Sequence, residues 1–137
     1  MISGSMAFAK EMYKAKEQLE NMGHVVGLPY ETEIHLENPA LVDNLSDNLQ
    51  YCIDNDVLHK SFDFIAQADA IVVLNYPRHA VEGYIGTSTL MEIAIAYHFH
   101  KKIFLLFAVP HFDKVRWAHE IAIMQPQILD GDLSKIS

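Results

Sequence analysis

The sequence is poor in cysteine, because Cys52 is the only one among 137 residues. A single thiol cannot form a disulfide within the chain, and chains with little cysteine are typical of reducing compartments. The composition therefore excludes a small disulfide-stabilised scaffold. We expect a cytoplasmic protein.

Long hydrophobic runs are also missing. The longest apolar run has seven residues, 103–109, and is closed by Pro110. That length suits a buried strand, whereas a membrane-crossing helix needs about 20 residues. The chain reaches the polar turn Ser3-Gly4-Ser5 after only two residues, so we predict no signal peptide. A membrane is not an expected partner.

Basic side chains are scarce. Lys and Arg total 10 against 18 Asp and Glu, which gives a formal net charge of -8 at pH 7. Proteins that bind nucleic acid polymers usually carry a basic surface, so this charge argues against such a partner. A single nucleotide remains compatible with it, because a few local donors can bind one phosphate within an acidic protein.

Residue patterns that hold metals or mark common catalytic sites are absent too. His98 and His100 are two residues apart on an expected helix and therefore point in different directions. No Cys, His or carboxylate spacing resembles a zinc site. Neither a G-x-S-x-G elbow nor a complete phosphate-binding glycine loop occurs. We predict no metal and no other cofactor.

The sequence does contain an alternation of strand and helix patterns. Apolar spacing predicts helices over residues 7–22, 49–68, about 88–101 and 113–124, and strands at 1–2, 24–28, 69–75, 102–109 and 127–129. This order is typical of an α/β three-layer sandwich with a parallel, flavodoxin/Rossmann-like sheet of about five strands. We predict one domain, 1–137. The acidic segment 29–48 is expected to be part loop and part helix, and to act as a lid or binding segment.

The fold predicts where a ligand binds. In open parallel sheets, ligands bind beyond the carboxyl ends of the strands, where segments 3–6 and 75–87 are expected to lie. A small-residue turn before a helix presents N–H groups and hydroxyls to an anion, although a tight turn with an N-cap explains the same residues. The candidate substrate-binding residues are Ser3, Gly4, Ser5, Asn75, Tyr84, Gly86, Thr87 and Ser88.

Glu92 is the one charged residue in the segment GYIGTSTLMEIAIAY, residues 83–97. Thr89 and Glu92 fit a T-x-x-E capping box, which is a purely structural interpretation. However, Ile95, Ala96 and Phe99 follow at helical spacing, so Glu92 heads a stripe that otherwise points inward. An acid at that place, on the ligand side of a parallel sheet, is also well positioned to meet a bound molecule. Both interpretations stay open.

Four segments, ISGSM, ADAIVVLN, GYIGTSTLMEIAIAY and KKIFLLFAVP, resemble the nucleoside 2-deoxyribosyltransferase superfamily, which includes 2'-deoxynucleoside 5'-monophosphate N-glycosidases. The likeness covers nearly the whole chain. It implies that the N-glycosidic bond of a nucleoside or nucleoside 5'-monophosphate is cleaved, by hydrolysis or transfer. Glu92 matches the glutamate that attacks the sugar, and the Ser-Gly-Ser turn matches the one that contacts the nucleoside or its phosphate. Asp69 matches an acidic residue that opens a strand. A homodimer or larger homo-oligomer is also implied.

The chain departs from this family at three positions. An aspartate commonly stands six residues before the glutamate, with glycines four and two before it, whereas this chain has Gly86, Ser88 and Leu90. The general acid that assists departure of the base is therefore unassigned. Sequence proximity alone offers Glu82, Asp63 and Asp56.

These departures favour an alternative, a non-catalytic nucleotide-binding module that kept the fold and pocket. Tyr84 either stacks on a base or packs within the protein. A phosphoribohydrolase-like enzyme fits less well, because its glycine-rich P-G-G-x-G-T-x-x-E motif is absent.

Overall fold

A four-stranded parallel sheet forms the centre of the computed structural model, which describes residues 1–137. Its strands are β1 (Ile2–Ser3), β2 (Ala70–Val73), β3 (Lys102–Leu105) and β4 (Gln127–Ile128), in that order. The two central strands are runs of branched and aromatic apolar residues, as expected of parallel strands that are covered on both faces.

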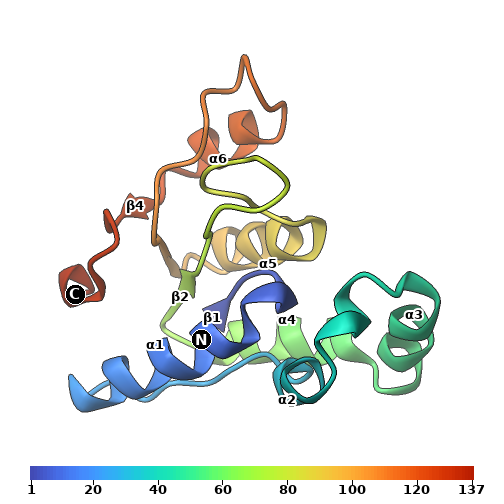
Figure 1. The fold of residues 1–137 in the computed structure, drawn as a ribbon. Coiled ribbons are helices and arrows are strands. Elements are labelled where there is room, and N and C mark those ends of the chain that lie inside the picture. Colours follow the sequence, from blue (N-terminus) through green and yellow to red (C-terminus); the bar gives the residue numbers. More distant parts are fainter.

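Helices cover both faces of this sheet (Figure 1). Val72 of β2 packs with Met12 on one face, whereas Val73 packs with Ile65 and Ile93 on the other. The α/β class with a parallel sheet is therefore confirmed, and the layers are consistent with a Rossmann-like sandwich. The helices are α1 (Ala9–Asn21), α2 (Thr32–Glu37), α3 (Leu45–Asp54), α4 (Val57–Gln67), α5 (Thr87–His98) and α6 (Ala118–Met124), with the 3-10 turns η1 (Met6–Phe8), η2 (Pro39–Val42) and η3 (Leu133–Lys135). None has the length and apolarity of a membrane-crossing helix.

The fifth strand predicted at 24–28 does not form. This segment runs along the outer edge of β1, where the Ile2 N–H donates to the Gly27 carbonyl oxygen at 2.9 Å. This is the one backbone hydrogen bond between the segment and β1, so no regular ladder forms between them. The sheet therefore has four strands, and the fifth place is occupied by irregular chain.

Two predicted helices are also shorter than expected. The helix predicted at 49–68 is two helices, α3 and α4, because Asp56 takes a left-handed conformation with φ of 50° between them. The helix predicted from residue 113 begins only at Ala118. Segment 29–48 is part helix, as expected, and contributes α2 and η2.

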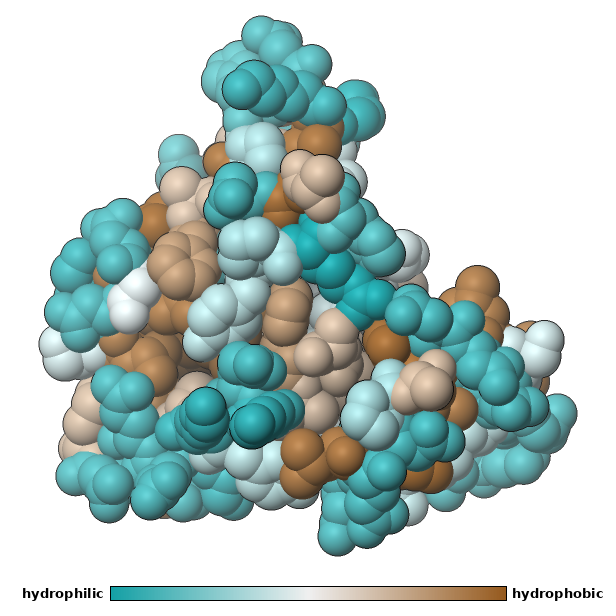
Figure 2. All heavy atoms as spheres, in the orientation of Figure 1, coloured by the Kyte–Doolittle hydropathy of each residue, from teal (hydrophilic) through white to brown (hydrophobic).

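Helix α3, with η2 before it, forms an arm at the right of Figure 1. No residue of α3 is buried, although Leu45, Leu49 and Ile53 recur every four residues along one side of it. Their side chains are 61–73% exposed. Figure 2 shows brown, hydrophobic residues on this side of the molecule. The arm therefore carries an apolar stripe without a partner in the monomer.

Candidate active site

A cavity of about 740 Å³ lies at the carboxyl end of β1, between the arm and the start of α5. The turn after β1 and the loop between β2 and α5 both line it, so the cavity lies beyond the carboxyl ends of two parallel strands. Ligands of open α/β sheets bind beyond the carboxyl ends of the strands. The volume is within the ordinary range for sites that take small molecules.

Glu92 lines this cavity and is only 7% exposed. Its Oε2 accepts a hydrogen bond from Ser3 Oγ on β1, and its Oε1 accepts one from Ser61 Oγ on α4 at 2.5 Å. The carboxyl group therefore joins three elements at the floor of the cavity.

The capping-box interpretation of Glu92 is wrong. Helix α5 begins at Thr87 with Gly86 as its N-cap, so Thr89 is a buried residue inside the helix. Glu92 lies beyond the first turn and bonds to side chains of other elements, not to its own backbone. What remains is a buried acid whose partners are two serine hydroxyls.

Burial raises the pKa of Glu92 from 4.5 to about 7. The hydrogen bonds from Ser3 and Ser61 oppose this rise, because they stabilise the charged form, whereas the charge of Glu31 adds to it. The group therefore changes between acid and carboxylate near neutral pH. Such a pKa suits a group that takes part in chemistry.

The turn after β1 shapes one wall. Gly4 has a φ of 152°, and a Cβ there would lie 3.0 Å from the Leu74 carbonyl oxygen. Glycine thus lets the turn pass close to the end of β2. Ser5 lines the cavity and caps η1, since its Oγ accepts from the Ala7 N–H at 3.3 Å.

Arg78 is the one Lys or Arg side chain that lines the cavity, and it is 15% exposed. Its Nη1 donates to Ser5 Oγ at 3.3 Å, and its Nη2 donates to Asp43 Oδ1 at 2.9 Å. Sequence reasoning missed this residue. The signal was its place in segment 75–87, which the fold predicted to reach the ligand side of the sheet.

A second acid, Glu31, also lines the cavity together with His35. Glu31 is the N-cap of α2 and His35 lies in its last turn, and both have a buried side-chain atom without a hydrogen-bond partner, Oε2 and Nε2 respectively. Burial raises the pKa of Glu31 above its usual value. These two atoms are the only buried side-chain polar atoms of the protein that lack a partner. Neither residue was predicted.

The cavity brings together most of the predicted substrate-binding residues, but not all. Ser3 lies behind Glu92 and does not line the cavity. Asn75 is fully buried, and its side-chain amide exchanges hydrogen bonds with the backbone of Phe107 at 2.7 and 2.8 Å. It therefore joins the ends of β2 and β3. The predicted residues that do line the cavity are Gly4, Ser5, Tyr84, Gly86, Thr87, Ser88 and Glu92.

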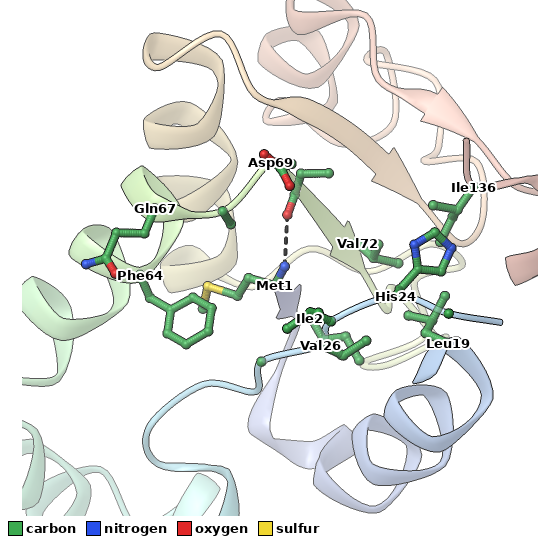
Figure 3. Close-up of a pocket in the computed structure, with 15 residues that line it drawn as sticks. Met1, Ile2, Leu19, His24, Val26, Phe64, Gln67, Asp69, Val72 and Ile136 are labelled. Carbon is green, nitrogen blue, oxygen red and sulfur yellow. Dashed lines mark hydrogen bonds between the residues drawn. The ribbon is translucent and has the colours of Figure 1, made fainter. Parts of the chain in front are cut away.

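None of the three acids proposed from sequence proximity, Glu82, Asp63 or Asp56, lines the cavity. Asp69 lies at the opposite end of the sheet, beside a second cavity of about 760 Å³ (Figure 3). That cavity has mostly apolar walls, and the amino group of Met1 donates to the Ala70 carbonyl oxygen there at 2.9 Å. Nowhere in the chain do three His, Cys, Asp or Glu side chains come together as a metal site.

Comparison of the chain with protein-family models, with curated proteins and with solved structures gives no match. The class of this protein is therefore defined by its fold and its candidate site alone. It is an α/β protein with a parallel sheet, and the buried Glu92 and the half-buried Glu31 share a cavity at the carboxyl ends of its strands. The resemblance to nucleoside 2-deoxyribosyltransferases stays an expectation from the sequence.

Proposed function

We propose that the protein cleaves the N-glycosidic bond of a nucleoside or nucleoside 5'-monophosphate, with Glu92 as the nucleophile. The observation that carries this proposal is a single buried carboxyl group that lines a ligand-sized cavity and takes its hydrogen bonds from two serine hydroxyls. Burial destabilises the charged form of such an acid, and a catalytic role is the best explanation for its presence.

The reaction follows from the chemistry of a carboxylate. An oxygen of Glu92 attacks the anomeric carbon, the bond to the base breaks, and a glycosyl ester forms on Glu92. Water or a second base then takes the sugar and frees the carboxylate. Ser3 and Ser61 orient the carboxyl group and keep a share of it ionised, since they donate to the charged form.

Arg78 supports a substrate that carries a phosphate. It is the one permanent positive charge in the cavity walls, and it lies next to Ser5 and the turn after β1. Guanidinium groups bind phosphate oxygens well. In this proposal a 5'-phosphate binds between Arg78 and the turn, and Thr87 and Ser88 hold the sugar. The unpaired Cys52 agrees with a cytosolic enzyme.

A second copy of the chain is the partner that we propose for the arm. Leu45 and Leu49 of the exposed α3 stripe also line the cavity, so a second copy packed on the stripe would narrow its mouth. Light scattering tests this part. A monomer at micromolar concentration, or a dimer unaffected by Leu49→Glu, contradicts it.

The rival function is a nucleotide-binding module without catalysis. Gly86 favours it, because glycine stands where the resembled family commonly has an aspartate. A module would bind the same ligands in the same cavity but release no base.

A substrate panel separates the two functions. The protein is incubated with deoxyribonucleosides, ribonucleosides and their 5'-monophosphates, and free base is measured by chromatography. We expect base release from at least one substrate and a loss of about 1,000-fold or more in Glu92→Gln, since the nucleophile is gone. Asp69→Asn makes the same acid-to-amide change at the other cavity and serves as the control. Ligand binding without any base release sinks the enzymatic proposal.

A further inference from the structure

We infer that Glu31 is the general acid that protonates the departing base, and that Glu31 and His35 together form the base-binding end of the cavity. This inference rests on the proposed function. It assigns the step for which the sequence offered no residue.

The first support is the pair of unpartnered atoms. Glu31 Oε2 and His35 Nε2 are shielded from solvent, belong to cavity-lining residues and have no hydrogen-bond partner. His35 is only 3% exposed. Leaving such groups unpaired costs stability, so a partner supplied by a ligand is the simplest account of both.

The second support is the hydrogen arrangement on His35. Its Nδ1 lies 2.9 Å from the Glu31 carbonyl oxygen, which can only accept, so Nδ1 carries the hydrogen. In the neutral ring Nε2 is then an acceptor. A protonated Glu31, which lines the same cavity, is a donor. An N–H donor next to a ring-nitrogen or carbonyl acceptor, as on the edge of a nucleobase, complements this pair.

The third support is the placement of the two acids. Glu31 stands at the N-terminus of α2 and Glu92 on α5, and both line one cavity. The charge of Glu31 also raises the pKa of Glu92, so Glu31 lies within electrostatic range of the nucleophile. The other titratable residues that line the cavity are Asp43, Cys52, Arg78, His79 and Tyr84. Besides burial, the charge of Glu31 also raises the pKa of Cys52 and of the neighbouring Tyr51. Asp43 is paired with Arg78. Glu31 is thus the remaining acid in the cavity that can protonate the base.

The proton balance is complete. As Glu92 attacks the sugar, the electron pair of the C–N bond moves to the base, and Glu31 gives its proton to the base. The ionised Glu31 then accepts a proton from the water that attacks the glycosyl ester, and both acids return to their starting forms. The sum is nucleoside plus water giving free base plus sugar.

The experiment compares leaving groups. The best natural substrate from the panel is set against the nicotinamide riboside or mononucleotide with the same sugar, whose base leaves neutral without a proton. We expect Glu31→Gln to lower kcat/KM about 100-fold or more on the natural substrate, and to change it little on the nicotinamide substrate. Glu33→Gln, an exposed acid on the same helix, is the matched control.

A second readout uses the wild-type protein alone. A rate that falls at alkaline pH with the natural substrate, but not with the nicotinamide substrate, supports the assignment without any variant. Equal losses in Glu31→Gln on both substrates, or no loss on either, overturn it. Glu92→Gln must lose both activities. If the wild-type protein releases base from neither substrate, the proposed function fails, and this assignment fails with it.

Discussion

The two cavities of this protein have almost the same volume, about 740 Å³ at the carboxyl end of the sheet and about 760 Å³ at the amino end. Their chemistry differs. The amino-end cavity has mostly apolar walls and no unpartnered buried side-chain atom, whereas the carboxyl-end cavity holds both such atoms of the chain and its most buried acid. An unpaired buried polar group costs about 1–3 kcal/mol. The unpaired buried polar atoms therefore distinguish the candidate site from the other cavity, whereas the cavity volumes do not.

The largest expected effect that tests this contrast between the cavities is the change in the free energy of unfolding caused by Glu92→Gln. The pKa of Glu92 is raised from 4.5 to about 7 by folding, so its contribution to stability is complete below pH 4.5 and is lost as the pH rises through about 7. Glu92→Gln removes that loss. We expect the variant to be more stable than wild type by up to about 3 kcal/mol at pH 8, with a smaller gain at pH 5.

Urea unfolding at both pH values measures this difference. Asp69→Asn, the same change at the exposed acid of the amino-end cavity, should not reproduce the gain. A Glu92→Gln protein that is less stable than wild type at pH 8 contradicts the burial account of the carboxyl-end cavity.

The next effect concerns phosphate. Arg78→Ala removes the permanent cation of the carboxyl-end cavity, and hydrogen bonds to charged groups are worth about 1.5–3 kcal/mol. We expect kcat/KM to fall about 10- to 100-fold for 5'-monophosphates, while the matching nucleosides change little. Arg116→Ala removes an exposed arginine just before α6 that is paired with Glu120, and it is the control. Equal losses on nucleosides and monophosphates would show that Arg78 does not read the phosphate.

The smallest effect is expected at the amino-end cavity. A Cβ at Gly27 would lie 1.8 Å from the ring of Phe64, but this half-exposed ring can swing aside. We expect Gly27→Ala to lower the free energy of unfolding by about 1 kcal/mol and to leave base release unchanged. Calorimetry measures the free energy of unfolding, and the substrate panel measures base release. Lost base release in a folded variant would break the contrast between the cavities.

The sequence predicted the central layout because its signals are local. Runs of branched apolar residues predict the strands near 69–75 and 102–109, and the alternation of these strands with helices implies parallel pairing. The strand at 24–28 failed for a reason outside its own residues. A strand depends on pairing with its neighbour, and only one backbone hydrogen bond joins this segment to β1.

The same limit applies to the site. Glu92 was found because it interrupts an apolar stripe, and Ser61 carries the same signal between Val57 and Ile65 on the buried face of α4. Glu31 and His35 had no such signal, since charged and polar residues are frequent in segment 29–48. Their burial comes from the packing of α2 against α1 and η1, which no local pattern reveals.

The hydrogen bonds of Glu92 have one further consequence. Ser3, Ser61 and Glu92 belong to three elements that are far apart in the sequence, so the proton affinity of one carboxyl group depends on how all three are docked. Any substitution that loosens α4 or the edge strand will alter that affinity before it unfolds the chain. Titration of Glu92, followed by NMR, would thus serve as an internal gauge of assembly in damaged or engineered versions of this protein.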